Sequence, residues 1–313
     1  MDKYWQDRQL REEKKVYDKG SELIKEYTKY LDTCQREIQN SINKYTVEFM
    51  KEHKLNYNEA NKYLSAQDKT LFKKDLKEFL KKHKSETDIV EKKKLYLEID
   101  LIQTKRKIKR LEYLKAQIDM ELIKYADEFK QAIQEELMKV YEEVYNSLGK
   151  DIGLKAMLDK EKILELINKP FAGENYSQRI WSNTDKLARV VKQELVNSMI
   201  QGVNVGKMTD RIIDRLDKAK YSNVERVVRT ELNNAFNQAT LKGYEDAEIK
   251  YYVYLATLDN RTSQICASLN GEKFKIDNAV TGINYPPMHP NCRSTTIPVI
   301  DYTDLNKEVE SKL

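Results

Sequence analysis

The chain has 313 residues, 34% of them charged, and 56 Lys and Arg against 51 Asp and Glu leave a formal net charge of +5. A mean hydropathy of -0.77 indicates a large surface relative to the core, as in an elongated protein of about two domains. So small a net charge excludes binding to nucleic acid or membranes through overall charge, and any such binding must come from local patches.

The sequence also indicates the cellular compartment in which the protein is made. No apolar window of about 18 residues occurs, and Met1 to Lys15 is charged throughout, so we expect neither a membrane span nor a signal peptide. The three cysteines, at positions 34, 266 and 292, show no short-range pairing pattern, which favours a reducing compartment. We therefore expect a protein made in the cytoplasm.

The first half of the chain is predicted to be helical, because Met1 to Leu148 contains a single glycine and no proline. From Ile108 to Val144, apolar residues recur at three- and four-residue steps, which predicts one long amphipathic helix. Its predicted partners are Tyr4 to His53 and Tyr57 to Lys84. Residues 1–169 are therefore expected to form an extended helical domain, either a bundle or a coiled-coil-like arm.

Helix-breaking residues gather at Asn168 to Asn175, so we place a linker at 170–176. Two further helices are predicted beyond it, at Ser177 to Ile200 with Ser177 as the N-cap, and at Met208 to Leu241 opening at Thr209. Aromatic and β-branched residues then predict short strands at Tyr251 to Thr257, Gly271 to Phe274 and Thr295 to Ile300. The predicted fold is mainly α, with a small α+β carboxyl-terminal domain at 177–300 and a tail at 301–313.

The stretch PPMHPNCRST, from Pro286 to Thr295, contains residues that could bind a metal. Zinc accepts Cys266, His289 and Cys292 as ligands, with a fourth from Asp259 or water. However, only His289 and Cys292 are close in sequence, whereas zinc fingers usually show two close ligand pairs. We therefore favour a rigid turn with a buried cysteine over a zinc site, and we expect no cofactor.

A catalytic pair of Cys292 and His289 is the other chemical interpretation. Arg293 could favour the thiolate, but the prolines around His289 hold the backbone away from a helix, so the three-residue spacing does not imply that the side chains meet. Asp259 and Glu231 could be acids or bases, yet turns and salt bridges explain them equally well. Phosphate-binding glycine loops are absent from the sequence, which excludes the common ATPase and dinucleotide-binding classes. We expect no catalytic residues.

A strip of basic residues between Gln103 and Ala116 is the strongest candidate for DNA binding. It could hold several phosphates without reading the base sequence. The alternative is an ordinary solvated face of a long helix. The strip consists of Lys105, Arg106, Lys107, Lys109, Arg110 and Lys115.

Five short motifs follow one another in the second half of the chain. They are Ser177-Gln178-Arg179-Ile180-Trp181, Arg229-Thr230-Glu231, Asp259-Asn260-Arg261-Thr262 with Cys266, Leu269-Asn270-Gly271-Glu272, and His289-Pro290-Asn291-Cys292-Arg293. As a set they resemble the head morphogenesis, or minor head protein, family of tailed bacteriophages, whose carboxyl-terminal domain is similar to the F protein of phage Mu. The resemblance covers about Ser177 to Val299, and the opening Tyr4 to Arg8 extends it more loosely over the whole chain. Ser294 departs from the family's common Asn-Cys-Arg-Cys ending and removes a potential thiolate.

The resemblance implies a low-copy protein near the portal inside the phage head, which assists head assembly and DNA packaging or ejection and contacts DNA without sequence preference. Its implied partners are the portal protein, phage double-stranded DNA and the scaffold or major capsid protein, with no membrane during assembly. It implies a location in the virion, and in the host cytoplasm during assembly. A metal-dependent hydrolase or transferase-like enzyme is the alternative, and a cellular coiled-coil scaffold is a third hypothesis.

We expect the motif residues to be structural. The stretch PPMHPNCRST is predicted to be a rigid turn leading into the last strand, with Asn291 and Arg293 hydrogen-bonding across the small domain. The planar guanidinium of Arg293 suits two parallel hydrogen bonds to a carboxylate, that of Asp259 or Glu231. The predicted structural motif comprises Arg229, Glu231, Asp259, Arg261, His289, Asn291, Cys292 and Arg293.

Overall fold

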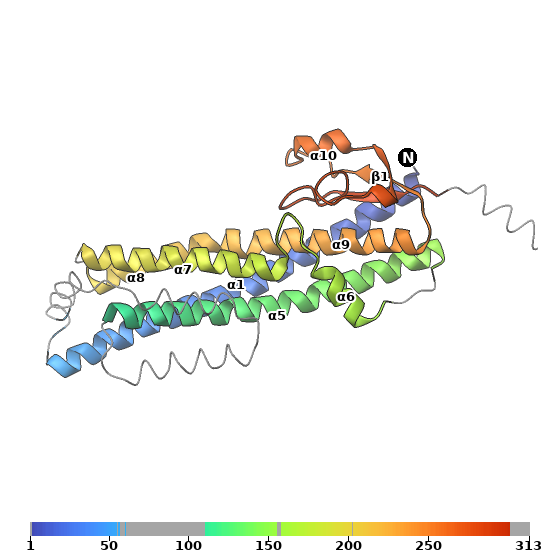
Figure 1. Ribbon diagram of the computed structural model, residues 1–313. Coiled ribbons are helices and arrows are strands. Elements are labelled where there is room, and N and C mark those ends of the chain that lie inside the picture. Colours follow the sequence, from blue (N-terminus) through green and yellow to red (C-terminus); the bar gives the residue numbers. More distant parts are fainter. Residues whose placement is uncertain are drawn as a thin grey trace, which may run out of the picture. The chain divides into compact units, whose positions relative to one another are not determined.

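The computed structural model describes residues 2–54, 56, 60, 110–154, 158–201 and 203–300 (Figure 1). Its fold class is the predicted one, mainly α with one small antiparallel sheet near the carboxyl terminus. The α-helices are α1 (Lys3–His53), α5 (Arg110–Ile152), α6 (Lys160–Ile167), α7 (Tyr176–Ile200), α8 (Val205–Lys220), α9 (Arg226–Asp246) and α10 (Gln264–Leu269). A π-helical segment (Tyr221–Glu225), a 3-10 segment (Ile276–Asn278) and the strands β1 (Tyr251–Leu255), β2 (Lys273–Lys275) and β3 (Thr295–Pro298) complete the described elements.

The described residues form two compact units that are not consecutive in sequence. The first unit comprises Met1–Glu26, Lys130–Ile180 and Val224–Leu313, and the second comprises Tyr27–Phe129 and Trp181–Asn223. This grouping differs from the predicted division into 1–169 and 177–300. The difference arises because α1, α5 and α7 each continue from one unit into the other, so a break in composition does not coincide with a break in packing.

The first unit carries the sheet, in which β1 lies between β2 and β3 and pairs antiparallel with both. Alternate residues of β1 point inward, so Tyr252 and Tyr254 are fully buried. Tyr252 packs edge-on against Tyr285, with ring centroids 5.2 Å apart. The apolar core of this unit comprises Trp5, Leu148, Tyr244, Tyr252, Leu255, Ile276, Tyr285 and Ile297.

Gly243 shows how closely α5 and α9 approach each other in the first unit. A Cβ atom at this position would lie 2.7 Å from Cδ2 of Leu148, closer than real side chains come. Polar side chains also join the elements of this core: the Gln9 amide donates to the Tyr244 hydroxyl at 3.1 Å and to the Thr296 carbonyl at 2.9 Å. The amino-terminal turns of α1 are therefore part of the same core as the sheet.

Two predicted helix starts are corrected by the local hydrogen bonds. Helix α7 begins one residue before the predicted N-cap Ser177, because Asn175 and Gln178 form a reciprocal capping box in which each side chain accepts from the other's backbone N–H at 2.9 Å. Helix α8 begins before Thr209, because the Asn204 side chain caps it by accepting from the Lys207 amide. The predicted single helix from Met208 to Leu241 is instead α8, the π-helical segment and α9.

The second unit has its own aromatic and ionic core. The Phe129 ring lies 5.3 Å from the ring of Tyr27 and 6.0 Å from that of Tyr125. The Lys192 ammonium binds both carboxylate oxygens of Asp119 at 2.6 and 2.8 Å, and both residues are buried. This unit therefore contains both an aromatic cluster and a buried ion pair.

Within the described part of the chain, no helix is both long and apolar enough to cross a membrane.

Candidate functional site

The motif Arg229-Thr230-Glu231 lies on α9 in the first unit, a helix in which most residues are buried. Consecutive residues of an α-helix point about 100° apart, so the three side chains leave the helix in three directions. Each side chain meets a different segment of the chain. Three adjacent residues therefore hold together parts of the unit that are far apart in sequence.

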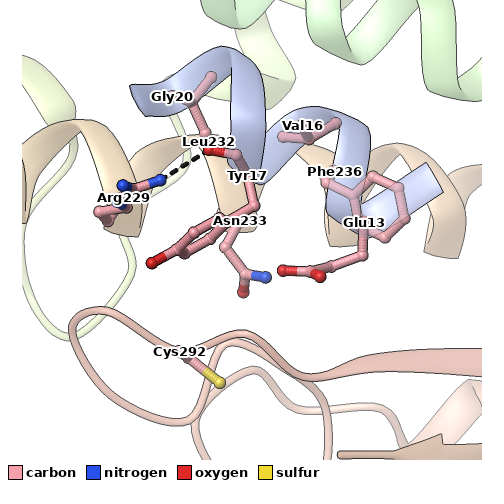
Figure 2. A pocket seen from close by; sticks show the side chains of 9 residues that line it. All are labelled: Glu13, Val16, Tyr17, Gly20, Arg229, Leu232, Asn233, Phe236 and Cys292. Carbon is pink, nitrogen blue, oxygen red and sulfur yellow. Dashed lines mark hydrogen bonds between the residues drawn. The ribbon is translucent and has the colours of Figure 1, made fainter. Parts of the chain in front are cut away.

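Arg229 binds α1. Its guanidinium donates to the Tyr17 carbonyl at 2.6 Å and to the Ser21 hydroxyl at 3.0 Å, and it stacks 3.8 Å above the Tyr17 ring (Figure 2). Gly20 allows this contact, since a Cβ there would lie 3.0 Å from Cδ1 of Leu232 and 3.4 Å from the guanidinium. The close approach of α1 to α9 thus accounts for Gly20, the one glycine between Met1 and Leu148.

Glu231 points to the turn before α7 and forms a buried ion pair with Arg179, at 2.6 Å between Nε and the carboxylate. Burial raises the pKa of the Glu231 carboxyl to about 7, although Arg179 acts in the opposite direction. The same guanidinium also donates to the carbonyls of Phe171 and Glu174. Residues 170–176, which were predicted to be a linker, therefore contain a turn that is fixed by hydrogen bonds from Arg179.

Thr230 meets the stretch PPMHPNCRST. Its hydroxyl accepts from the Asn291 backbone amide at 3.1 Å and donates to the Arg226 carbonyl. Asn291 has a φ of 61°, a left-handed conformation that asparagine adopts more readily than most residues. About two turns further along α9, the Asn237 amide donates to the Ser294 carbonyl at 3.1 Å. The stretch is thus fastened to α9 at two points, in agreement with the predicted turn.

Arg293 holds the loop that follows β1. Its two terminal nitrogens bind the two carboxylate oxygens of Asp259 at 2.7 and 2.6 Å, which is the parallel pairing expected from the sequence. This pairing lowers the pKa of the Asp259 carboxyl below its ordinary value. Arg261 is largely exposed, and its backbone amide donates to Asp259. Of the two carboxylates proposed for Arg293, the structure therefore selects Asp259.

Cys266, His289 and Cys292 converge, although their spacing in the sequence did not imply it. The Cys266 sulfur lies 3.3 Å from Nε2 of His289 and 3.8 Å from the Cys292 sulfur, and the three atoms lie within 4.8 Å of one another. Both cysteines are only 2% exposed. Asp259, the carboxylate suggested as a fourth zinc ligand, is bound to Arg293 instead and does not belong to this cluster.

The two cysteines are chemically different. Hydrogen bonding from Cys292 lowers the pKa of the Cys266 thiol, and the same pairing raises the pKa of the Cys292 thiol. The Tyr254 hydroxyl adds a further hydrogen bond to the Cys266 sulfur, at 3.4 Å.

A small hollow lies between α1, α9 and the Cys292 loop, and it has room for about one water molecule (Figure 2). The Glu13 carboxyl lies at this hollow and points toward Asn233. Burial raises the pKa of Glu13 to about 7. The sequence analysis missed Glu13, and the available signal was its spacing of four and seven residues from Tyr17 and Gly20, which places all three on one helix face.

The predicted DNA-binding strip falls almost entirely outside the described residues, which exclude Lys105, Arg106, Lys107 and Lys109 and the side chain of Arg110. Lys115 is described and lies half-buried on α5. Burial, with help from the nearby Lys192 ammonium, lowers the pKa of Lys115. Lys115 is therefore less available to a phosphate than an exposed lysine would be.

Comparison with known proteins identifies the carboxyl-terminal part. Residues 189–297 match the family described as Phage Mu protein F like protein, which confirms the family resemblance for that segment. An alignment 172 positions long is 30% identical between this chain and a protein of Enterococcus faecalis named NAD(+)-arginine ADP-ribosyltransferase EFV, and it covers 50% of this chain and 35% of that protein. A stretch of 117 residues, 37% of this chain, is 27% identical to a protein of Haemophilus influenzae named "Uncharacterized protein" and covers 25% of it. The chain thus spans a quarter to about a third of these relatives. No solved structure matches.

Proposed function

Because residues 189–297 form a phage Mu F-like domain, we propose that the protein is a minor head protein of a tailed phage, associated with the portal inside the capsid. In this role it assists head assembly and the packaging or ejection of DNA. The match of the F-like segment is the observation that carries the proposal. The portal protein, phage DNA and the scaffold or major capsid protein are the proposed partners.

The contacts of the motif residues support a structural role. Arg229, Thr230 and Glu231 are each occupied by bonds to another segment of the first unit. Arg293 is occupied in the same way by Asp259. A guanidinium or carboxylate that is fully paired within the protein has little capacity left to bind a substrate.

The alternative is a metal-dependent hydrolase or a transferase, and the name of the Enterococcus faecalis relative is the observation that favours it. That name belongs to a protein of which this chain covers only 35%. The head-protein function is therefore preferred.

The proposal predicts that the chain is a component of the particle. Phage particles made in cells that carry the gene should contain the protein in a few copies, in both proheads and mature virions, and chemical crosslinking should join it to the portal protein. Quantitative mass spectrometry of purified particles makes the measurement. Absence from both kinds of particle, with the protein found only in the cell lysate, would refute the proposed role.

DNA contact is the second part of the proposal, and it rests on the basic strip. If about five residues of this strip neutralise phosphates, the logarithm of the affinity should fall with the logarithm of the salt concentration with a slope of about -4 to -5. Replacing Lys105, Arg106, Lys109 and Arg110 by Gln should abolish most of the binding of the full chain to a random duplex. Glutamine is itself a good helix former, so the helix content should be unchanged.

A matched control removes the same number of positive charges elsewhere. Lys14, Lys15, Lys25 and Lys29 are exposed on α1, and their replacement by Gln should leave both the affinity and the salt slope nearly unchanged. Fluorescence anisotropy with a labelled duplex measures both quantities. Equal binding by the strip variant and the parent chain would exclude this strip as the DNA contact.

A further inference from the structure

Two of the three distances within the Cys266, His289 and Cys292 cluster match those of a tetrahedral zinc site, and the third, between the Cys292 sulfur and Nε2 of His289, is within 4.8 Å. Zn–S bonds of about 2.3 Å and Zn–N bonds of about 2.0 Å, at tetrahedral angles, place two sulfurs about 3.8 Å apart and a sulfur and a nitrogen about 3.5 Å apart. The corresponding distances here are 3.8 Å between the two sulfurs and 3.3 Å between the Cys266 sulfur and Nε2 of His289. The three atoms therefore need only small shifts to surround one ion.

The orientation of the His289 ring is also that of a metal ligand. Its Nδ1 lies 2.8 Å from the Pro290 carbonyl oxygen, which can only accept a hydrogen bond, so Nδ1 carries the proton. Nε2 is then the unprotonated nitrogen, which accepts a hydrogen bond from the Ser263 hydroxyl at 2.9 Å and faces the Cys266 sulfur. Ligating histidines usually have their other nitrogen fixed in this way by a carbonyl or a carboxylate.

A disulfide explains these positions less well. A bonded pair of sulfurs lies about 2.05 Å apart, whereas these sulfurs lie 3.8 Å apart. A metal ion at the centre of the three atoms would stabilise all of them at once.

We propose that Cys266, His289 and Cys292 bind one Zn²⁺ ion through their two sulfurs and Nε2, with a water molecule as the fourth ligand. His289 is partly exposed, so water can reach the fourth position. The ion would join α10, which carries Cys266, to the loop before β3, which carries the other two ligands. Cys266 and Cys292 are 26 positions apart, and among the described residues no disulfide and no other metal-binding cluster connects the segments that carry them.

The test uses the full chain, purified under reducing conditions and saturated with one equivalent of zinc. Metal analysis should find one zinc per chain in the parent. Cys266→Ser and Cys292→Ser should each lower the zinc content to about a tenth or less. Cys34→Ser is the matched control, because Cys34 is an equally buried free cysteine in the second unit, and it should keep one zinc.

Cobalt provides a measurement that does not depend on the stability of the variants. Co²⁺ added to the zinc-free parent chain should give intense tetrahedral d–d bands and charge-transfer bands from two thiolates, and zinc should displace it. A folded, reduced parent chain that binds neither metal would overturn the proposal. Zinc retained by both cysteine variants, or a cobalt spectrum without thiolate bands, would overturn it as well.

Discussion

Arg179→Met is expected to lower the free energy of unfolding of the full chain by about 3 to 5 kcal/mol near pH 8, because it leaves the buried Glu231 carboxylate without its partner. The Glu231 side chain is 2% exposed, so water cannot replace the lost ion pair. The change also removes the hydrogen bonds to the turn that precedes α7. Urea denaturation followed by circular dichroism measures the loss.

Two controls distinguish the effect of leaving the Glu231 charge unpaired from the effect of removing an arginine in general. Arg293→Met breaks an equally short bidentate pair, but its partner Asp259 is 35% exposed and can be rehydrated, so the loss should be much smaller. Adding Glu231→Gln to Arg179→Met removes the buried charge and should restore part of the stability. Equal losses from Arg179→Met and Arg293→Met would contradict the proposed origin of the effect.

The second expected result concerns Glu13 and pH. Burial raises the pKa of Glu13 to about 7, so between about pH 4.5 and pH 7 the folded chain holds a proton that the unfolded chain has released. The stabilising contribution of that proton is complete below about pH 4.5 and is lost as the pH rises to about 7. A shift of this size corresponds to roughly 3 kcal/mol.

Glu13→Gln replaces the carboxyl by a neutral amide of the same shape. The variant should match the parent near pH 5 and exceed its free energy of unfolding by roughly 2 to 3 kcal/mol near pH 8. The charged groups that act on Glu13 are Arg293, Asp18, Arg229 and Lys14, and they are unchanged in the variant. Urea denaturation at both pH values measures the difference.

Glu22→Gln is the matched control, since Glu22 lies on the same helix but is exposed, and it should leave the pH dependence of the parent unchanged. A constant difference between Glu13→Gln and the parent across this pH range would show that the Glu13 carboxyl titrates as an ordinary exposed one.

The helices, the order of the strands along the chain and the family match of residues 189–297 were predictable from local sequence. The apolar periodicity from Ile108 to Val144 predicted most of α5, because the 3.6-residue repeat of a helix is encoded in consecutive residues. The aromatic run at Tyr251 predicted β1 for a similar reason. The bidentate chemistry of Arg293 predicted a carboxylate partner, and the structure supplies Asp259. In each case the prediction depends only on the type of a residue and on its neighbours in the sequence.

Only the tertiary structure decided which distant residues meet. Cys266 and His289 are 23 positions apart, and Arg179 and Glu231 are 52 apart, so no local pattern states that they are in contact. The burial that raises the pKa of Glu13 and Glu231 likewise depends on the packing of separate helices. The division into compact units also depends on tertiary packing. Helices α1, α5 and α7 each contribute residues to both units, so helix-breaking residues do not mark the boundary between the units.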